Sequence, residues 1–600
     1  MTATAQKTGA EEVLFDLSDL YSGPDDPKIE SDLGESLKAA EAFRDRYHGK
    51  FGKLEAKELA EAITELERIY SVISRAGIFA YLRFATDTAD PARGALVQSI
   101  REKSAKLQTD LLFAELEWLA VEDDRAEELL SDPALKHYRH WLGALRRFRP
   151  YVLTEPEEKI LTEKSVTGAS AWSRLFTELT AAMRVTIDGE ELPLEQATSR
   201  LQRPDRDERK RAAEAITRAL EEGLRTRAFI FNTLLLDKAT SDRLRGYPSW
   251  ISERNLSNEA ADESVEALVE AVSSRFDIPQ RYYALKAKLL GLDRIADYDR
   301  MAPLHSDTVF IEWDEAQRTV QEAYDSFSPV TGDIIRRFFD EKWIDAAAVP
   351  NKAPGAFCMT TVPNVHPYVL MSYTADKVSV LTLAHELGHG LHGALAQDLG
   401  LLNASTPLTL AETASVFGET ITFGKLLEKE SDPKKRLDLI AHRLEDAIGT
   451  VFRQIAMNRF EDAVHNQRRN EGELSVDSIS KVWIDTQKKM LGESVEITDN
   501  YKIWWSHIPH FIGSPGYVYA YAFGFLFSLA IYRRYEQEGS SMVEPYLELL
   551  RAGGSDSPEN LAGIVGLDLA DPSFWAGGLE TIDSILGEAE ELAREIGNEE

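Results

Sequence analysis

One apolar stretch of the sequence contains histidine and glutamate side chains. It spans residues 378–397 and reads VSVLTLAHELGHGLHGALAQ, with apolar residues on most sides of a helix drawn through it. This pattern predicts a buried helix, because a helix that is apolar all round has no face suited to water. His385, Glu386 and His389 lie within it, and burying them without a partner would cost free energy. Their burial therefore calls for a partner that can bind all three side chains.

These three residues form an HExxH pattern, in which two histidines are separated by about one helical turn. Side chains at positions i and i+4 lie one above the other, so both imidazoles can bind a single Zn²⁺ while Glu386 lies beside the open coordination position. A metal ion is the partner that suits all three side chains. We expect Asp376 to cap the start of this helix, with Thr374 as the alternative.

A catalytic zinc site usually needs a third protein ligand and leaves its fourth position to water. Residue 395 is leucine, which excludes the arrangement HExxHxxGxxH. His392 lies on the same face, but three ligands on one helix would diverge, so we interpret it as a supporting or packing residue. The better candidate is Glu412, in the helix predicted over residues 408–425. Glu419 lies two turns further along and could accept the second N–H of a ligating histidine.

Composition excludes several kinds of protein. A net charge of −33 argues against nucleic acids and anionic membranes as partners. No segment reaches the roughly 20 uninterrupted apolar residues of a membrane helix, and the N-terminus lacks a secretory signal pattern, so we expect a cytoplasmic protein. The single cysteine, Cys358, excludes an intrachain disulfide and a zinc site built on cysteines. We interpret it as a small core residue rather than a nucleophile.

Helical periodicity covers most of the chain and predicts a mainly α protein. Apolar residues recur at three- and four-residue spacing in the ranges 54–73, 78–87, 91–119, 155–175, 433–470 and 476–491. Residues 183–194 instead alternate about Asp188 and Gly189, which indicates a β-hairpin. Residues 356–362 and 368–373 predict a small β region next to the active site. We expect an exposed edge strand there to hold an extended peptide beside the metal.

A second group of polar side chains lies in residues 507–521, where glycines and prolines favour a loop in the first half. The group comprises two histidines and three tyrosines: His507, His510, Tyr517, Tyr519 and Tyr521. Hydroxyl and imidazole donors are what a zinc hydrolase needs to stabilise the oxyanion of a tetrahedral intermediate. The alternative is an aromatic packing strip, since Phe511, Phe523 and Phe525 are close in sequence.

Three motifs together resemble the oligoendopeptidase F family, relatives of thimet oligopeptidase. They are HELGHGLH at 385–392, AETASVFGE at 411–419 and HIPHFIGSPGYVYAYAFG at 507–524. The resemblance extends over nearly the whole chain, including residues 162–176 and 243–259. It implies an elongated, almost entirely helical protein with a deep cleft that admits short unfolded peptides.

The resemblance also implies a role for each site residue. It implies three ligands for one Zn²⁺ per chain: His385, His389 and Glu412. It implies three donors to the transition state: His510, Tyr517 and Tyr521. Glu386 would be the general base. Tyr519 competes for either tyrosine role, because the spacing from His510 to Tyr517 is two residues longer than in the thimet-type proteins.

We therefore predict a zinc-dependent oligoendopeptidase with a polar lead-in (1–30), an N-terminal helical region (31–200) and a catalytic region (201–600). In this hypothesis the metal activates water, and Glu386 passes the proton to the leaving amine. One alternative is a zinc carboxypeptidase of the same helical class, which needs a basic anchor for a free carboxylate. Another is a non-catalytic peptide-binding protein whose structural zinc takes His392 as its fourth ligand. The oligomeric state and the cleavage preference are not predicted.

Overall fold

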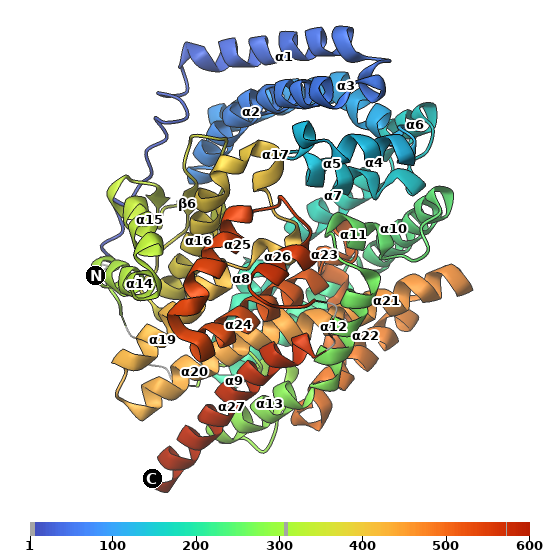
Figure 1. Cartoon of the computed structure of the whole chain (residues 1–600). Helices are drawn as coiled ribbons and strands as arrows, with labels where there is room; N and C mark the ends of the chain where they lie inside the picture. Colours follow the sequence, from blue (N-terminus) through green and yellow to red (C-terminus); the bar gives the residue numbers. More distant parts are fainter. Residues whose placement is uncertain (1–6, 305–309, 570, 572, 600) are drawn as a thin grey trace. The chain divides into compact units, whose positions relative to one another are not determined.

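The computed structural model describes residues 7–304, 310–569, 571 and 573–599 of the 600-residue chain. Helices dominate and the strands are few and short, so the predicted mainly α fold is confirmed (Figure 1). The chain forms two compact units. The first comprises residues 1–149, 308–429 and 531–569, and the second comprises residues 150–307, 430–530 and 570–600. Among the described residues, no helix is long and apolar enough to cross a membrane.

The first unit contains the HExxH helix and most of the N-terminal helices. Its helices are α1 (Pro27–Tyr47), α2 (Ala56–Thr86), α3 (Pro91–Leu119), α4 (Asp123–Ser131), α5 (Arg139–Arg146), α14 (Trp313–Phe327), α15 (Pro329–Asp340), α16 (Lys377–Ala396), α17 (Gly400–Ala404), α18 (Leu408–Ala411), α19 (Ser415–Lys429), α25 (Val543–Ala552) and α26 (Pro558–Ile564). The three long helices α1, α2 and α3 pack against one another (Figure 1). Helix α16 packs against α14, α15, α19 and α25, which places HExxH inside this unit.

Several helices begin with a short polar residue followed by proline. At the start of α3 the Asp90 carboxylate accepts a hydrogen bond from the N–H of Ala92, and Pro91 occupies the first turn. The same arrangement begins α1, α15, α20 and α26. Such a cap contributes about 1 kcal/mol, and proline in the first turn sacrifices no helical hydrogen bond. The predicted start of a helix at Pro91 is confirmed.

The predicted break between residues 73 and 78 is wrong. The separate helices expected over 54–73 and 78–87 are the single helix α2, which continues through Gly77. Glycine lowers helix propensity by about 1 kcal/mol. Here the flanking side chains of Ala76 and Phe79 are buried, so packing against α1 and α3 outweighs that local preference.

The second unit is built around a buried aromatic cluster. Its helices are α6 (Glu155–Ser165), α7 (Ala169–Ala181), α8 (Leu194–Ser199), α9 (Arg206–Glu221), α10 (Leu224–Arg245), α11 (Ser252–Ser257), α12 (Asp262–Ser274), α13 (Asp277–Leu289), α20 (Pro433–Ala447), α21 (Arg453–Glu471), α22 (Val476–Leu491), α23 (His510–Gly513) and α27 (Phe574–Glu599), while α24 (Tyr519–Glu538) contributes residues to both units. Phe460 of α21 and Phe511 of α23 pack with ring centroids 4.9 Å apart. Trp483 and Phe231 belong to the same cluster. Burial of Phe511 fixes the chain next to His510.

The strands form three small sheets. Strands β1 (Arg184–Ile187) and β2 (Glu190–Pro193) make the predicted hairpin, in which Asp188 and Gly189 both have positive φ, as a tight primed turn requires. The β region before α16 is also confirmed: its strands are β4 (Ile344–Asp345), β5 (Phe357–Met359) and β6 (Tyr368–Leu370), in the order β4-β6-β5. Strand β5 therefore lies at an edge. A third pair joins β3 (Ile295–Ala296) to β7 (Val495–Glu496).

Candidate active site

Helix α16 holds the HExxH residues in fixed positions. Its first turn is capped by Asp376, whose carboxylate accepts a hydrogen bond from the N–H of Ser379 at 2.7 Å, so the first of the two expected caps is correct. Leu383, Leu387 and Leu391 are at most 1% exposed. Burying each leucine contributes about 1.5–3 kcal/mol, so the helix is firmly anchored by its apolar face.

The helix predicted over residues 408–425 is interrupted at Glu412, which corrects the sequence expectation. Helix α18 ends before Glu412 and α19 begins at Ser415. The Thr413 hydroxyl donates to the carbonyl of Leu410 at 2.7 Å, and the Ser415 hydroxyl donates to the Glu412 carboxylate at 2.6 Å. Such local bonds from threonine and serine compete with the helical ladder. Glu412 therefore lies in a turn and does not share one helix face with Glu419.

Gly388 lets this turn lie directly against α16. A Cβ atom at this position would lie 2.6 Å from the Cα of Ser415 and would collide with the carbonyl of Ala414. Only glycine permits such a close approach of two backbones. The residue between the two histidines thus allows Glu412 to reach them.

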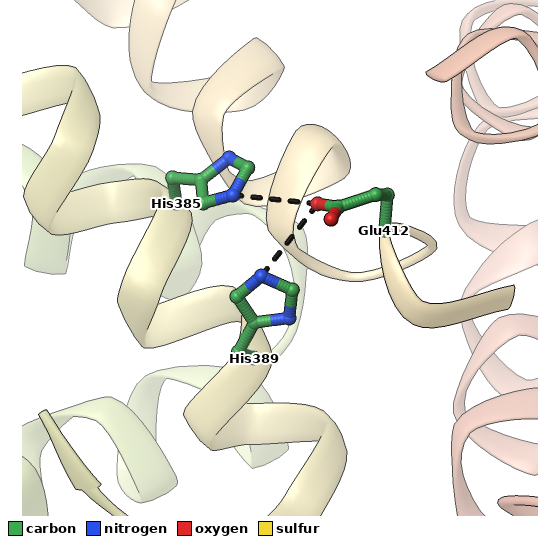
Figure 2. Close-up of side chains that lie close together, drawn as sticks. All are labelled: His385, His389 and Glu412. Atoms are coloured by element: carbon green, nitrogen blue, oxygen red, sulfur yellow. Dashed lines mark ion pairs between the residues drawn. The ribbon is translucent and has the colours of Figure 1, made fainter. Parts of the chain in front are cut away.

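Three potential ligand atoms converge at this contact. Figure 2 shows the imidazoles of His385 and His389 pointing toward the Glu412 carboxylate. The two Nε2 atoms lie 3.3 Å and 3.5 Å from Oε2 of Glu412, and the ligand atoms of all three residues lie within 4.8 Å of one another. Two ligands at about 2.1 Å from a tetrahedral ion are about 3.4 Å apart, so the spacing fits one Zn²⁺. Among the described residues, this is the one group of three that could hold a metal.

The electrostatics of the cluster also favour a cation. Burial lowers the pKa of His389 to about 4, so its imidazole is neutral at pH 7. Burial opposes ionisation of Glu412, but the hydrogen bond from His385 and the charge of the imidazoles lower its pKa to about 2. Burial likewise opposes a charged His385, yet hydrogen bonds to Glu412 and Glu419 hold its pKa well above the ordinary value. The cluster stabilises positive charge beside Glu412, which a divalent cation supplies.

Groups behind the ligands orient their rings. Nδ1 of His385 lies 3.3 Å from Oε2 of the buried Glu419, and the backbone of Ala411 hydrogen-bonds to His389. A bond at one ring nitrogen fixes the tautomer and leaves the other nitrogen free to bind a metal. The structure therefore brings Glu419 next to His385. This is the position expected from the sequence for a residue that supports a ligating histidine.

A cavity of about 560 Å³ opens beside the cluster. Its lining includes the three candidate ligands, Glu386 and residues 356–358 of the edge strand region. Burial raises the pKa of Glu386 to about 7, although the charge of His385 and a hydrogen bond from the Cys358 backbone oppose this rise. A carboxyl group with a pKa near neutrality can both accept and release a proton. Cys358 is only partly buried by its surface area, so it is a cavity residue rather than a core residue.

The second predicted cluster lies in the second unit. Nε2 of His510 lies 3.3 Å from the Tyr521 hydroxyl, and the rings of Tyr517 and Tyr521 have centroids 4.9 Å apart. All three side chains are half-buried. The expected loop here includes the short helix α23, which begins at His510. The structure brings the three expected donors together.

Tyr519 and His507 do not join this group. Tyr519 is fully buried, and its hydroxyl accepts a hydrogen bond from the Asn258 amide at 2.9 Å. His507 is partly buried, and burial lowers its pKa to about 4, so its imidazole is neutral at pH 7. The geometry therefore favours Tyr517 and Tyr521 over Tyr519.

Two family models match the sequence. The one described as Peptidase family M3 matches residues 199–581, and the one described as Oligopeptidase F matches residues 117–184. The first match alone covers more than half of the chain. The chain belongs to peptidase family M3.

Relatives of this M3 peptidase carry oligopeptidase names. It is 28% identical over 570 residues to Oligopeptidase PepF of Bacillus subtilis, which covers 92% of this chain and 83% of that protein. It is 24% identical over 595 residues to an oligoendopeptidase F homolog of Lactococcus lactis subsp. lactis, with 97% of each chain covered. The crystal structure of oligoendopeptidase-F from Enterococcus faecium has a TM-score of 0.72 at 24% identity, and the match covers 95% of this chain and 98% of that one. The resemblance to oligoendopeptidase F is confirmed, and the protein is a peptidase.

The cavity of this M3 peptidase includes residues that sequence reasoning missed. Gly393, Gln397 and five residues of the segment 400–406 (400, 401 and 404–406) line it, together with His392. His392 is buried, and its Nε2 has no hydrogen-bond partner among the described residues. The segment 400–406 has no periodicity or motif that would distinguish it from an ordinary surface loop. Its position follows from a contact with α2, where the Leu402 N–H donates to Glu67 at 3.0 Å.

The contact between Glu419 and His385 leads to a first prediction. Changing Glu419 to glutamine keeps a hydrogen-bond acceptor but removes the charge that raises the basicity of His385. We expect zinc affinity to fall about 10-fold or more, since changes behind metal ligands typically cost 10–100-fold. Competition with a chromogenic chelator measures this affinity. Glu428→Gln, at an exposed site on the same helix, is the control. Equal zinc affinities in the two variants would contradict the role of Glu419.

Proposed function

We propose that this M3 peptidase is a zinc-dependent oligoendopeptidase that cleaves internal bonds of short unfolded peptides. The observation that carries the proposal is the convergence of His385, His389 and Glu412 at a cavity that also contains Glu386. Two imidazoles and one carboxylate are the ligand set of many catalytic zinc sites. One Zn²⁺ per chain, bound there, would polarise the scissile carbonyl and acidify water.

The remaining chemistry belongs to the side chains of the chain itself. We assign Glu386 the transfer of a proton from the attacking water to the leaving amine, because its carboxyl group lies in the cavity next to His385. We assign His510, Tyr517 and Tyr521 the donation of hydrogen bonds to the oxyanion, each worth about 3 kcal/mol in the transition state. Their mutual contacts and half-buried position support this assignment.

An extended peptide could pair with the edge strand β5. Among the described residues this strand has a partner on one side only, and its Phe357 and Cys358 line the cavity beside Glu386. Main-chain hydrogen bonds to an edge strand bind a peptide without reading its sequence closely. We further propose that residues 201–600, which contain every site residue, form the catalytic region behind a lead-in (1–30) and a helical region (31–200).

Two observations weigh against the alternative functions. A carboxypeptidase needs a cation to bind the free carboxylate, and none of the described residues lining the cavity is lysine or arginine. A structural zinc needs a fourth protein ligand. His392, the fourth ligand that this alternative requires, lines the cavity but is not part of the group that could hold a metal.

Product analysis tests the proposed function. A peptide of about nine residues, blocked at both ends, should be cut at internal bonds, and mass spectrometry identifies the fragments. The same peptide with a free C-terminus should give the same fragments. Stepwise loss of single residues from the free peptide, with no cleavage of the blocked one, would instead support a carboxypeptidase.

A further inference from the structure

The backbone just before Tyr517 is held by a buried glutamate. The N–H of Gly516 donates to Oε1 of Glu461 at 3.0 Å, and Glu461, on α21, is fully buried. Gly516 has a φ of +72°, a conformation that side-chain-bearing residues rarely adopt. A Cβ atom there would lie 3.2 Å from Ile251 and 3.4 Å from Trp250. The chain is thus fixed in one conformation directly before a proposed donor.

The segment 250–258 provides two further attachments on either side of Tyr517. Nε of Arg254 donates to the carbonyl of Pro515 at 3.4 Å. The Asn258 amide donates to the hydroxyl of Tyr519 at 2.9 Å. The motif at residues 243–259 therefore contacts the chain on both sides of Tyr517. The sequence alone does not predict this contact.

Glu461 is chemically unusual for a purely structural position. Its Oε2 atom has no hydrogen-bond partner among the described residues, and burial raises its pKa to about 8. The side chain is therefore mainly neutral at pH 7. An apolar residue would avoid the cost of burying this group, but it would leave the Gly516 N–H without an acceptor. Among the described residues, its one hydrogen bond is with the Gly516 N–H, directly before a proposed donor.

We infer that Glu461 is a positioning residue, whose Oε1 atom holds the Gly516 N–H so that Tyr517 and Tyr521 stay beside His510. This inference rests on the proposed function, since Glu461 would act on hydrolysis only through those donors. It assigns Glu461 no contact with the substrate or the metal. Its loss should therefore lower kcat more than it changes KM.

Two substitutions of similar size test whether the hydrogen-bond acceptor of Glu461 is what matters. Glu461→Gln keeps an oxygen that can accept the Gly516 N–H, whereas Glu461→Leu does not. We expect the kcat of Glu461→Gln to stay within about twofold of that of the unchanged enzyme. We expect Glu461→Leu to lower kcat at least tenfold, with KM within about threefold and zinc content unchanged. Glu471→Leu, at the exposed C-terminal end of α21, is the matched control.

A double-mutant cycle distinguishes positioning from general damage. In a Tyr517→Phe/Tyr521→Phe background the donors are absent, so Glu461→Leu should lower kcat much less than in the unchanged enzyme. If Glu461→Leu does not fold, Gly516→Ala tests whether kcat depends on the position of this backbone, because its Cβ atom would press on Trp250 and Ile251.

The outcomes separate this inference from the function on which it rests. Three results would overturn the inference alone. They are an unchanged kcat in Glu461→Leu, equal decreases in kcat in Glu461→Leu and Glu461→Gln, or a decrease in kcat that is as large in the Tyr517→Phe/Tyr521→Phe background as in the unchanged enzyme. Unchanged kcat in the Tyr517→Phe/Tyr521→Phe enzyme would overturn the donor assignment, and the inference with it.

Discussion

Replacing His389 with alanine should remove both bound zinc and peptide hydrolysis. The substitution leaves two of the three converging ligands, and the carboxylate of Glu412 then faces a single imidazole. Loss of a direct ligand should weaken zinc binding by more than the roughly 100-fold that the largest changes behind a ligand cost. Elemental analysis after dialysis against a weak chelator should therefore find almost no zinc in the variant.

His392 provides a matched control for this result. It lies three residues further along α16 and lines the same cavity, but it is outside the group of converging ligands. His392→Gln should therefore keep zinc at the level of the unchanged protein. If His392→Gln also lost its zinc, His392 would be a fourth ligand, and the closed site of a structural zinc would become the better interpretation.

Changing Glu386 to glutamine should lower turnover by several orders of magnitude while leaving zinc in place. Glutamine matches the shape of glutamate but cannot take a proton from water at neutral pH. General base catalysis typically contributes about 10²–10⁴-fold, and we expect kcat to fall by that factor. The measurement is the initial rate of hydrolysis of an internally quenched peptide, with zinc content determined on the same sample.

An exposed glutamate provides the control for Glu386. Glu428→Gln makes the same chemical change at an exposed site and should hydrolyse normally. Undiminished turnover in Glu386→Gln would show that another group acts as the base. Loss of zinc from that variant would show that Glu386 supports the metal rather than the proton transfer.

The parts of the site that depend on local spacing could be predicted from the sequence. Helix geometry alone puts His385 and His389 on one side of α16, and the apolar residues around them require that helix to be buried. The cap at Asp376 follows from the same local pattern. These features need no knowledge of distant segments.

The parts that depend on contacts between distant segments could not be predicted. The turn at Glu412 exists because Gly388 lets two backbones meet, and the apolar pattern of residues 408–425 is equally compatible with an unbroken helix. The sequence does not distinguish the three tyrosines within residues 517–521. In the structure Asn258, far earlier in the chain, donates a hydrogen bond to Tyr519 and so separates it from the other two. The two-residue strands β3 and β7 have no local signal, because each pairs with a segment about 200 residues away.

In the proposed function, one zinc ion held by His385, His389 and Glu412 makes this M3 peptidase an endopeptidase. The decisive experiment is stepwise addition of zinc to chelated protein while cleavage of an end-blocked peptide is measured. We predict that activity is absent without metal, rises with each addition and reaches a plateau at one zinc per chain. Full cleavage by the chelated protein, or a plateau that does not depend on the zinc bound, would contradict the claim.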